Sequence, residues 1–214
     1  MPTAETLIAF FGVAVLLGLS PGPDNVFVLL QSAQRGWRAG MAVVAGLCAG
    51  LVVHTAAVAL GLAAVFASSP AAFSALKWCG AAYLAYLAWQ AWRAPLTRVD
   101  TPAQQQPSHG RALWRMAGRG MAMNLTNPKV LIFFLAFLPQ FANPQRGSLA
   151  LQTMVLGCVF MLATFLVFGA IACFSGVFGA WLQRSAWAQR WLNRFASLVF
   201  LGLAARLALV EHTP

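Results

Sequence analysis

The chain has 214 residues, of which 60% are hydrophobic and only 8% are charged, and its formal net charge is +10. Soluble domains carry about 25% charged residues, so this composition excludes an ordinary soluble protein and indicates a polytopic membrane protein. The basic residues gather in a few segments between long apolar runs, which is typical of cytoplasmic loops and not of a nucleic-acid-binding face. We therefore expect the lipid bilayer as a partner and no nucleic acid.

Six apolar stretches are each long enough to cross a bilayer, which takes about 20 helical residues. The sequence thus predicts an all-α polytopic membrane protein with six transmembrane helices, forming a single transmembrane domain over residues 1–214. The predicted spans cover residues 5–33, 39–67, 71–92, 113–140, 148–182 and 187–210.

Basic residues predict the orientation of these spans, because loops rich in Lys and Arg remain in the cytoplasm. The loops after the first, third and fifth spans hold Arg35, Arg38, Arg93, Arg98, Arg111, Arg115, Arg119, Arg184, Arg190 and Arg194. The opposite side holds Lys77, Arg146 and Arg206. We therefore place the loops after the first, third and fifth spans in the cytoplasm and both the N- and the C-terminus outside.

The segment between the third and fourth spans is polar and rich in proline, with Pro95, Pro102, Pro107 and three glutamines at 104–106. This composition is typical of a linker. We expect a cytoplasmic linker over residues 94–112, between half one (1–93) and half two (113–214). Each half has an odd number of spans, so the second half enters the membrane in the opposite sense, which permits a 3+3 inverted-topology repeat.

The first span is interrupted by the run Ser20-Pro21-Gly22-Pro23-Asp24-Asn25. Proline lacks a backbone donor and clashes with the preceding turn, so this run predicts a broken helix. Asp24 is one of only four acidic residues in the chain. A carboxylate and an unwound backbone inside a membrane are tolerated where they line a protein cavity, so the run indicates a substrate or ion site.

The fourth span carries a second break, in which Asn124, Thr126, Asn127, Pro128 and Lys129 precede a very apolar run. Helix rise places both Asp24 and Lys129 about 15 to 17 Å from the cytoplasmic arginines, near the middle of the membrane. Two opposite charges at matched depth offset each other's desolvation, and a first helix broken by proline in each half is typical of a transporter binding site.

A zwitterionic amino acid suits such a site. Its carboxylate would meet Lys129 and the free donors of a half-helix, and its ammonium would meet Asp24 and exposed carbonyl groups. Neutral hydrogen bonds would come from Ser20, Asn25, Asn124, Thr126 and Asn127. A purely structural explanation stays open, in which Asp24 caps a helix or only pairs with Lys129.

His54 lies past the midplane of the second span by the same helix rise. A histidine there can relay protons together with Asp24, because its unperturbed pKa is near physiological pH. A hydrogen bond inside the pathway without proton transfer is the competing explanation.

Two pairs of glycines in the second span, Gly36 with Gly40 and Gly46 with Gly50, have the four-residue spacing that lets helix backbones approach closely. Packing within the chain and a dimer interface explain this spacing equally well.

No enzyme signature is present. The sequence contains no H-E-x-x-H metal pair and no G-x-S-x-G nucleophile turn. The four cysteines lie singly in apolar segments, so we expect no metal site and no cofactor.

Four strings carry a family resemblance, in order along the chain: LSPGPDNVFVLLQSAQRGWRAG, GLCAGLVVH, LKWCGAAYLAYLAWQAWR and NLTNPKVLIFFLAFLPQF. Together they resemble the LysE/RhtB family of amino-acid exporters. The resemblance implies a proton-driven, secondary-active exporter of the homoserine/threonine-like branch in the bacterial inner membrane, working as a homodimer. It places the family motifs at Ser20, Pro21, Gly22, Pro23, Asp24 and Asn25, and at Asn124, Asn127, Pro128 and Lys129.

The substrate is not settled by these motifs. With no second acidic residue in the membrane, we expect a neutral amino acid rather than a dibasic one, whose extra cation would need a partner. Export of another small metabolite or a cation, a passive channel and an inward direction of transport remain open.

Overall fold

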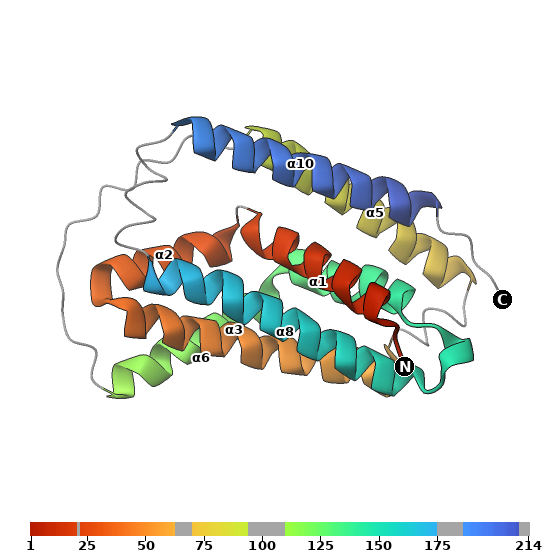
Figure 1. The fold of residues 1–214 in the computed structure, drawn as a ribbon, viewed down its shortest axis with the longest axis horizontal. Helices are drawn as coiled ribbons and strands as arrows, with labels where there is room; N and C mark the ends of the chain where they lie inside the picture. The colour runs from red at the N-terminus through yellow and green to blue at the C-terminus, as the bar shows by residue number, and fades with distance from the viewer. Residues whose placement is uncertain (21, 63–69, 94–109, 175–185, 210–214) are drawn as a thin grey trace.

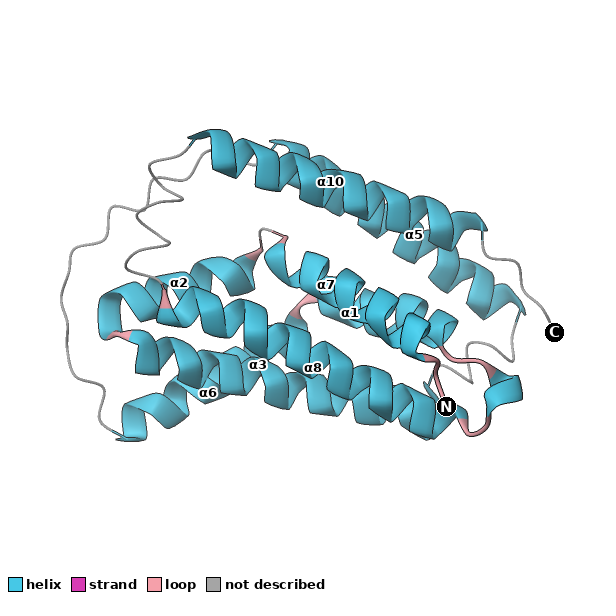
Figure 2. Ribbon diagram, in the orientation of Figure 1, coloured by secondary structure: helices cyan, strands magenta, loops and turns pink. Residues whose placement is uncertain are grey.

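The structure is a computed structural model that describes residues 1–20, 22–62, 70–93, 110–174 and 186–209. Within these ranges the regular elements are helices and no strand occurs (Figure 2). The α-helices are α1 (Ala4–Leu19), α2 (Pro23–Arg35), α3 (Trp37–Ala57), α5 (Pro70–Arg93), α6 (Gly110–Thr126), α7 (Pro128–Ile132), α8 (Leu149–Cys173) and α10 (Ala186–Leu209). The π-helical and 3-10-helical segments are η1 (Val58–Leu62), η2 (Phe133–Phe137), η3 (Leu138–Phe141) and η4 (Pro144–Arg146).

Two helices are long and apolar enough to cross a membrane by themselves. They are the segments Trp37–Gly61 and Leu149–Cys173, each of 25 residues. Two bent pairs qualify if each pair forms one span: α1 with α2, and α6 with Pro128–Phe141. α5 and α10 have 24 residues each, a length of about 36 Å, but fall short in apolar composition. In the described ranges, length and composition therefore support two to four of the six predicted spans.

Both predicted breaks are present. The chain bends by 65° between α1 and α2 and by 53° between α6 and Pro128–Phe141. Pro23 and Pro128 stand at the beginning of α2 and α7, where a missing N–H costs nothing. Each of these two prolines thus begins the second helix of its bent pair.

The last three residues of the predicted linker lie in a helix. α6 begins at Gly110, so residues 110–112 belong to this helix. Pro107 is the last proline before it, and Arg111 and Ala112 favour a helix. Residues 94–109 lie outside the described residues, as do residues 175–182 at the end of the predicted fifth span.

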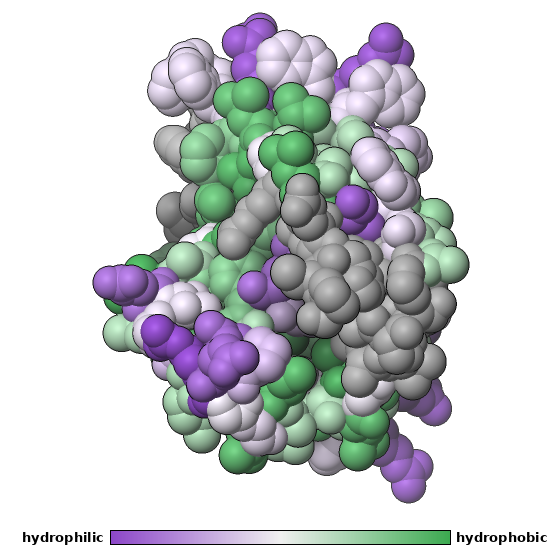
Figure 3. All heavy atoms as spheres, turned by 90° about the vertical axis from the view of Figure 1, so that its right-hand side faces the viewer, coloured by the Kyte–Doolittle hydropathy of each residue, from purple (hydrophilic) through white to green (hydrophobic). Residues whose placement is uncertain are grey.

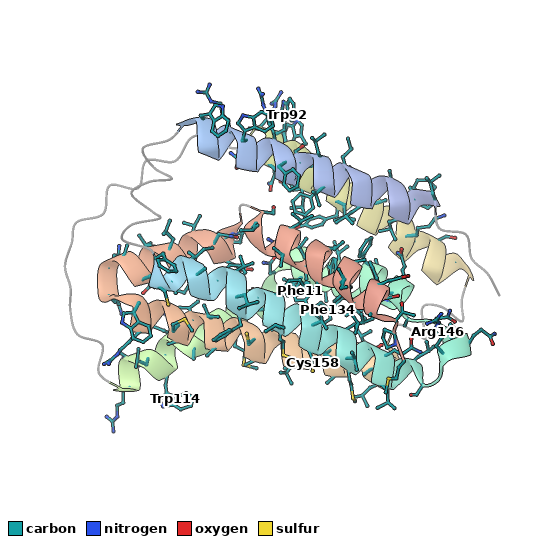
Figure 4. The ribbon with its side chains drawn as sticks, viewed as in Figure 1. Phe11, Trp92, Trp114, Phe134, Arg146 and Cys158 are labelled. Carbon is teal, nitrogen blue, oxygen red and sulfur yellow. The ribbon has the colours of Figure 1, made fainter. Side chains whose placement is uncertain are left out.

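The helices form two groups. Figure 1 shows α5 and α10 side by side as a pair, while α1, α3, α6 and α8 form the larger group. Buried phenylalanines join this group: the ring of Phe133 lies 5.8 Å from that of Phe10 on α1 and 5.2 Å from that of Phe160 on α8. Phe134 lies among the helices as well (Figure 4). This cluster holds η2, and with it α7, against α1 and α8.

Glycines bring α3 and α6 into close contact. A Cβ atom on Gly46 would lie 1.9 Å from the carbonyl oxygen of Ala117, and one on Gly120 would lie 2.3 Å from that of Val43. A Cβ on Gly50 would lie 2.6 Å from Asn124 Oδ1. The spacing of Gly46 and Gly50 therefore serves packing within the chain, as close backbone approach requires small residues.

The two ends of the helix bundle differ. The N-terminus, η4 and the end of α10 lie at one end (Figure 1), where the amino group of Met1 donates to the carbonyl of Arg146. Seen from this end, hydrophilic side chains gather on one side, with apolar surface above and below (Figure 3). The opposite end holds the turn between α2 and α3 and the first turns of α6 and α10. It carries Arg35, Arg38, Arg93, Arg111 and Arg190.

Candidate substrate site

The first break leaves a backbone carbonyl of α1 without its helical partner. The last regular bond runs from the N–H of Ser20 to the carbonyl of Leu16, at 3.0 Å. In a continuous helix the carbonyl of Leu17 would bond to position 21, but Pro21 has no N–H. Lys129 Nζ donates to this carbonyl instead, at 3.1 Å. A cation from the second half of the chain thus replaces a missing backbone donor of the first half.

The side chain of Asn25 pairs in the same way with the next carbonyl of α1. Its Nδ2 donates to the carbonyl of Gly18 at 2.7 Å. Gly22, the residue before α2, offers no side-chain cap, so the first N–H groups of this helix keep their capacity to donate. A Cβ atom at Gly22 would lie 3.3 Å from Lys129 Nζ, so glycine leaves room for the lysine here.

The second break repeats this pattern. Asn127 caps α7, since its Oδ1 accepts from the N–H of Lys129 at 3.0 Å. Pro128 has no N–H, which deprives the carbonyl of Asn124 of its helical partner. That carbonyl accepts from the N–H of Asn127 at 3.1 Å and lies 3.4 Å from His54 Nε2. In both breaks, therefore, a side chain of the other half approaches a carbonyl that a proline has freed.

Asp24 and Lys129 are joined through Asn127. Asp24 is 3% exposed and Lys129 is 6% exposed. The two charges attract each other without forming a direct ion pair. Instead Asn127 Nδ2 donates to Asp24 Oδ2 at 2.6 Å, while Asn127 Oδ1 binds the backbone of Lys129. Burial of a charge is tolerated only with such partners.

Three buried oxygen atoms at the breaks accept no hydrogen bond. They are Asp24 Oδ1, Asn25 Oδ1 and Asn124 Oδ1. Leaving a buried acceptor unpaired costs about 1 to 3 kcal/mol, more if it is charged. All three would accept from N–H or O–H groups, so the site favours a ligand that donates hydrogen bonds, such as an ammonium group.

A small cavity lies beside the two breaks, with room for about one water-sized molecule. Asp24, Asn124 and Lys129 supply its charged and amide groups, and α8 supplies a further wall. Its lining consists of Leu17, Gly18, Asp24, Leu47, Asn124, Lys129, Val130, Phe160, Thr164 and Phe168.

The structure brings together most of the residues that the sequence singles out. The buried ones are Ser20, Asp24, Asn124, Asn127, Lys129 and His54, and the partly buried ones are Gly22 and Asn25. Pro23 and Pro128 are exposed at the beginnings of their helices, and Pro21 lies outside the described residues. Thr126 is also exposed, and its hydroxyl donates to the carbonyl of Ala122 in its own helix at 2.9 Å. The structure therefore does not bring Thr126 to the cavity.

Three lining residues on α8 escape the sequence analysis. Phe160, Thr164 and Phe168 follow one another at intervals of four and so share a helix face. α8 is apolar along its whole length, so this spacing is no distinct signal in the sequence.

The described residues contain no group of three His, Cys, Asp or Glu side chains that could hold a metal ion. The cysteines are free thiols: Cys48 is half-buried, while Cys79, Cys158 and Cys173 are exposed. Cys158 points away from the other helices (Figure 4).

A buried carboxylate and a buried ammonium group, set between two proline-broken helices, are typical of membrane transporters that are built from discontinuous helices. The sequence then gives the family. A family model described as LysE type translocator matches residues 15–211. The chain belongs to the LysE-type translocator family.

Known relatives match over nearly their full length. A homoserine/homoserine lactone efflux protein of Salmonella typhimurium is 36% identical over 211 residues, which cover 98% of this chain and 99% of the relative. The protein of that description from Salmonella typhi matches to the same extent. An uncharacterized membrane protein of Vibrio cholerae is 32% identical over 203 residues, covering 94% and 95%. No solved structure matches the chain significantly.

Proposed function

We propose that this protein is a secondary-active exporter of neutral, homoserine- or threonine-like amino acids, driven by protons. One observation carries the proposal: the junction of the two breaks holds unpaired buried acceptors beside a buried lysine. That pairing of groups complements the ammonium and the carboxylate of an amino acid. The description of the two Salmonella relatives supports the homoserine-like substrate.

The binding mode follows from the contacts. The substrate's ammonium would donate to Asp24 Oδ1 and to the carbonyl of Leu17, which Lys129 Nζ now occupies. Once displaced, Lys129 would bind the substrate's carboxylate, together with the uncapped N–H groups at the beginning of α2. Lys129 would thus exchange one partner for another with each substrate molecule, and Ser20, Asn25 and Asn127 would complete the polar shell.

The cavity is too small for an amino acid in this arrangement. Substrate entry therefore requires the broken helices to move apart, which fits alternating access around a fixed site. α1–α2 and α6–α7 are the natural moving parts, because each already contains a bend.

A neutral substrate fits the charges of the site. Asp24 and Lys129 balance an ammonium and a carboxylate, and no other charged group lines the cavity among the residues that the structure describes. A dibasic amino acid would bring a cation without a partner, at a cost of several kcal/mol.

Proton coupling would use Asp24, exchanging a proton for the substrate's ammonium. His54 would serve as a relay, since its Nε2 lies 3.4 Å from the carbonyl of Asn124. Its ring also packs against that of Phe134, with 5.5 Å between centroids. The same contacts also suit a histidine that fixes the second break without transferring a proton.

The membrane arrangement belongs to the same proposal. Six spans, with α5 and α10 as the third and sixth, would form a 3+3 inverted repeat in the bacterial inner membrane, acting as a homodimer. The gathering of arginines at one end supports cytoplasmic loops there and both termini outside, in the periplasm.

Efflux from preloaded cells tests this function. Cells that express the protein are loaded with a mixture of amino acids through dipeptide uptake, and each released species is followed with and without the proton gradient. We expect faster, gradient-dependent release of homoserine, threonine or both. Non-saturable release would indicate a channel. Release that matches empty-vector cells for every amino acid would contradict the proposal and redirect the search to other metabolites or cations.

A further inference from the structure

Thr164 brings a hydroxyl group to the wall of the cavity. It lies on α8 between Phe160 and Phe168, and all three line the cavity. Its side chain is 5% exposed, so the residue is enclosed by protein. The sequence analysis does not assign it a role.

The Thr164 hydroxyl has no hydrogen-bond partner among the residues that the structure describes. Hydroxyl groups inside helices commonly bond to the carbonyl four residues earlier. Thr55 does so to Leu51 at 2.8 Å, and Ser32 does so to Val28 at 2.7 Å. The Thr164 hydroxyl, in contrast, remains available to a ligand in the cavity.

The rest of the lining makes this hydroxyl distinctive. Asp24, Asn124 and Lys129 are the groups that the proposed function assigns to the substrate's ammonium and carboxylate. Among the described lining residues the remaining wall is apolar apart from Thr164, and consists of Leu17, Gly18, Leu47, Val130, Phe160 and Phe168. A substrate side chain held there would meet apolar surface and one hydroxyl group.

We propose that Thr164 recognises a hydroxyl group on the substrate's side chain and so selects hydroxylated amino acids over apolar ones of equal size. This inference rests on the proposed function, since it assumes that an amino acid binds at the junction. A hydroxyl both donates and accepts, so it can pair with the hydroxyl of homoserine or threonine. An apolar side chain of the same shape would leave Thr164 unpaired on closure.

The expected selectivity is moderate. One neutral hydrogen bond in a buried site contributes about 1 kcal/mol, which corresponds to roughly fivefold to tenfold in kcat/KM. Phe160 and Phe168 would limit the size of the substrate's side chain, and Thr164 would select for a hydroxyl group on it.

Matched pairs of substrates test the inference: homoserine against norvaline, and threonine against valine. In each pair a hydroxyl replaces a methyl group at nearly constant size. Initial rates are measured in proteoliposomes for the wild type, Thr164→Val, Thr164→Ser and Thr153→Val. Thr153 is a matched control, because it is equally buried on α8 but lies about 16 Å away along the helix and does not line the cavity.

We expect the wild type to prefer the hydroxylated member of each pair by about fivefold to tenfold. Thr164→Val should reduce this preference to nearly one, mainly through a raised KM for homoserine, while norvaline transport persists. Thr164→Ser and Thr153→Val should keep the preference. An unchanged preference in Thr164→Val, or an equal loss in Thr153→Val, would overturn the role of Thr164 while leaving amino-acid transport standing. A wild type that transports none of the four amino acids would instead overturn the proposed function.

Discussion

Asn127 makes two contacts at the junction, one through each polar atom of its side-chain amide. Its Nδ2 group pairs with the buried carboxylate of Asp24, and its Oδ1 caps the helix that begins with Pro128 and Lys129. Removal of the Asn127 side chain would leave Asp24 Oδ2 unpaired and the beginning of α7 uncapped. The first loss costs about 1 to 3 kcal/mol and the second about 1 kcal/mol.

Asn127→Ala should therefore lower the free energy of unfolding by about 2 kcal/mol or more. For a protein of this size this is a decrease in Tm of roughly 4 to 8 °C, measured by thermal unfolding in detergent. Asn143→Ala is the control: Asn143 caps η4 through its Oδ1 at 2.9 Å, but it is exposed and supports no buried charge. Equal, small shifts in the two variants would show that Asn127 acts as a cap only.

Lys129 shows how a lysine can be held deep in an apolar chain. It reaches a carbonyl that Pro21 leaves free, so the break that exposes the carbonyl also provides for the cation. The attraction of Asp24 adds to this contact. In the proposed binding mode a substrate ammonium would replace Lys129 at the carbonyl of Leu17, so this structural contact is compatible with a role in transport.

Among the helices, the contact of α3 with α6 requires glycine, because a side chain there would meet backbone atoms of the other helix. Gly120 faces the backbone of Val43, which cannot rotate away as a side chain would. The same pair of helices holds His54 and Asn124 at the second break, so their separation would disturb the site. We therefore expect close packing here to support transport as well as stability.

We expect Gly120→Ala to destabilise the protein by several kcal/mol, because a Cβ atom 2.3 Å from the Val43 carbonyl forces the helices apart. Gly118→Ala, in the same helix, meets nothing within 4 Å and should be neutral or stabilising, as alanine favours a helix by up to about 1 kcal/mol. Thermal unfolding of both variants measures the difference. Similar melting temperatures would refute the close contact of α3 and α6.

The sequence predicts the breaks and the charges well, because prolines and ions inside apolar runs are rare and local signals. Asp24 and Lys129 are placed at matched depth by counting residues alone. Their bridge through Asn127 is not predictable in this way, since it depends on how two distant segments meet. Thr164 is missed for a related reason: a threonine in an apolar helix is ordinary until the structure shows that it lines the cavity.

The family resemblance read from four strings is confirmed by the match over residues 15–211. The number of spans is less certain from composition, because α5 and α10 are less apolar than α3 and α8. One reason is that these two helices carry exposed tryptophans and arginines. Trp89 lies against Arg93 at 4.9 Å and Trp92 against Arg194 at 5.4 Å, as at a membrane interface. Trp92 projects from the outer side of this helix pair (Figure 4).

The proposed orientation predicts opposite accessibility for the two ends. In a variant without native cysteines, Gln145→Cys in η4 should react with a membrane-impermeant thiol reagent from the periplasm. Arg111→Cys in the first turn of α6 should react only in everted vesicles. Both positions are exposed, so reactivity reports the side of the membrane. The reverse pattern of labelling would invert the orientation.

The junction of the broken helices is tested most directly by homoserine efflux through Asp24→Asn. The amide keeps the shape of the carboxylate but removes the charge that would hold the substrate's ammonium. We predict a loss of efflux of about 100-fold with normal amounts of protein in the membrane. Glu5→Gln, which neutralises an exposed acid in the first turn of α1, should transport as the wild type does. Wild-type efflux from Asp24→Asn would remove Asp24 from the mechanism and contradict the proposed site.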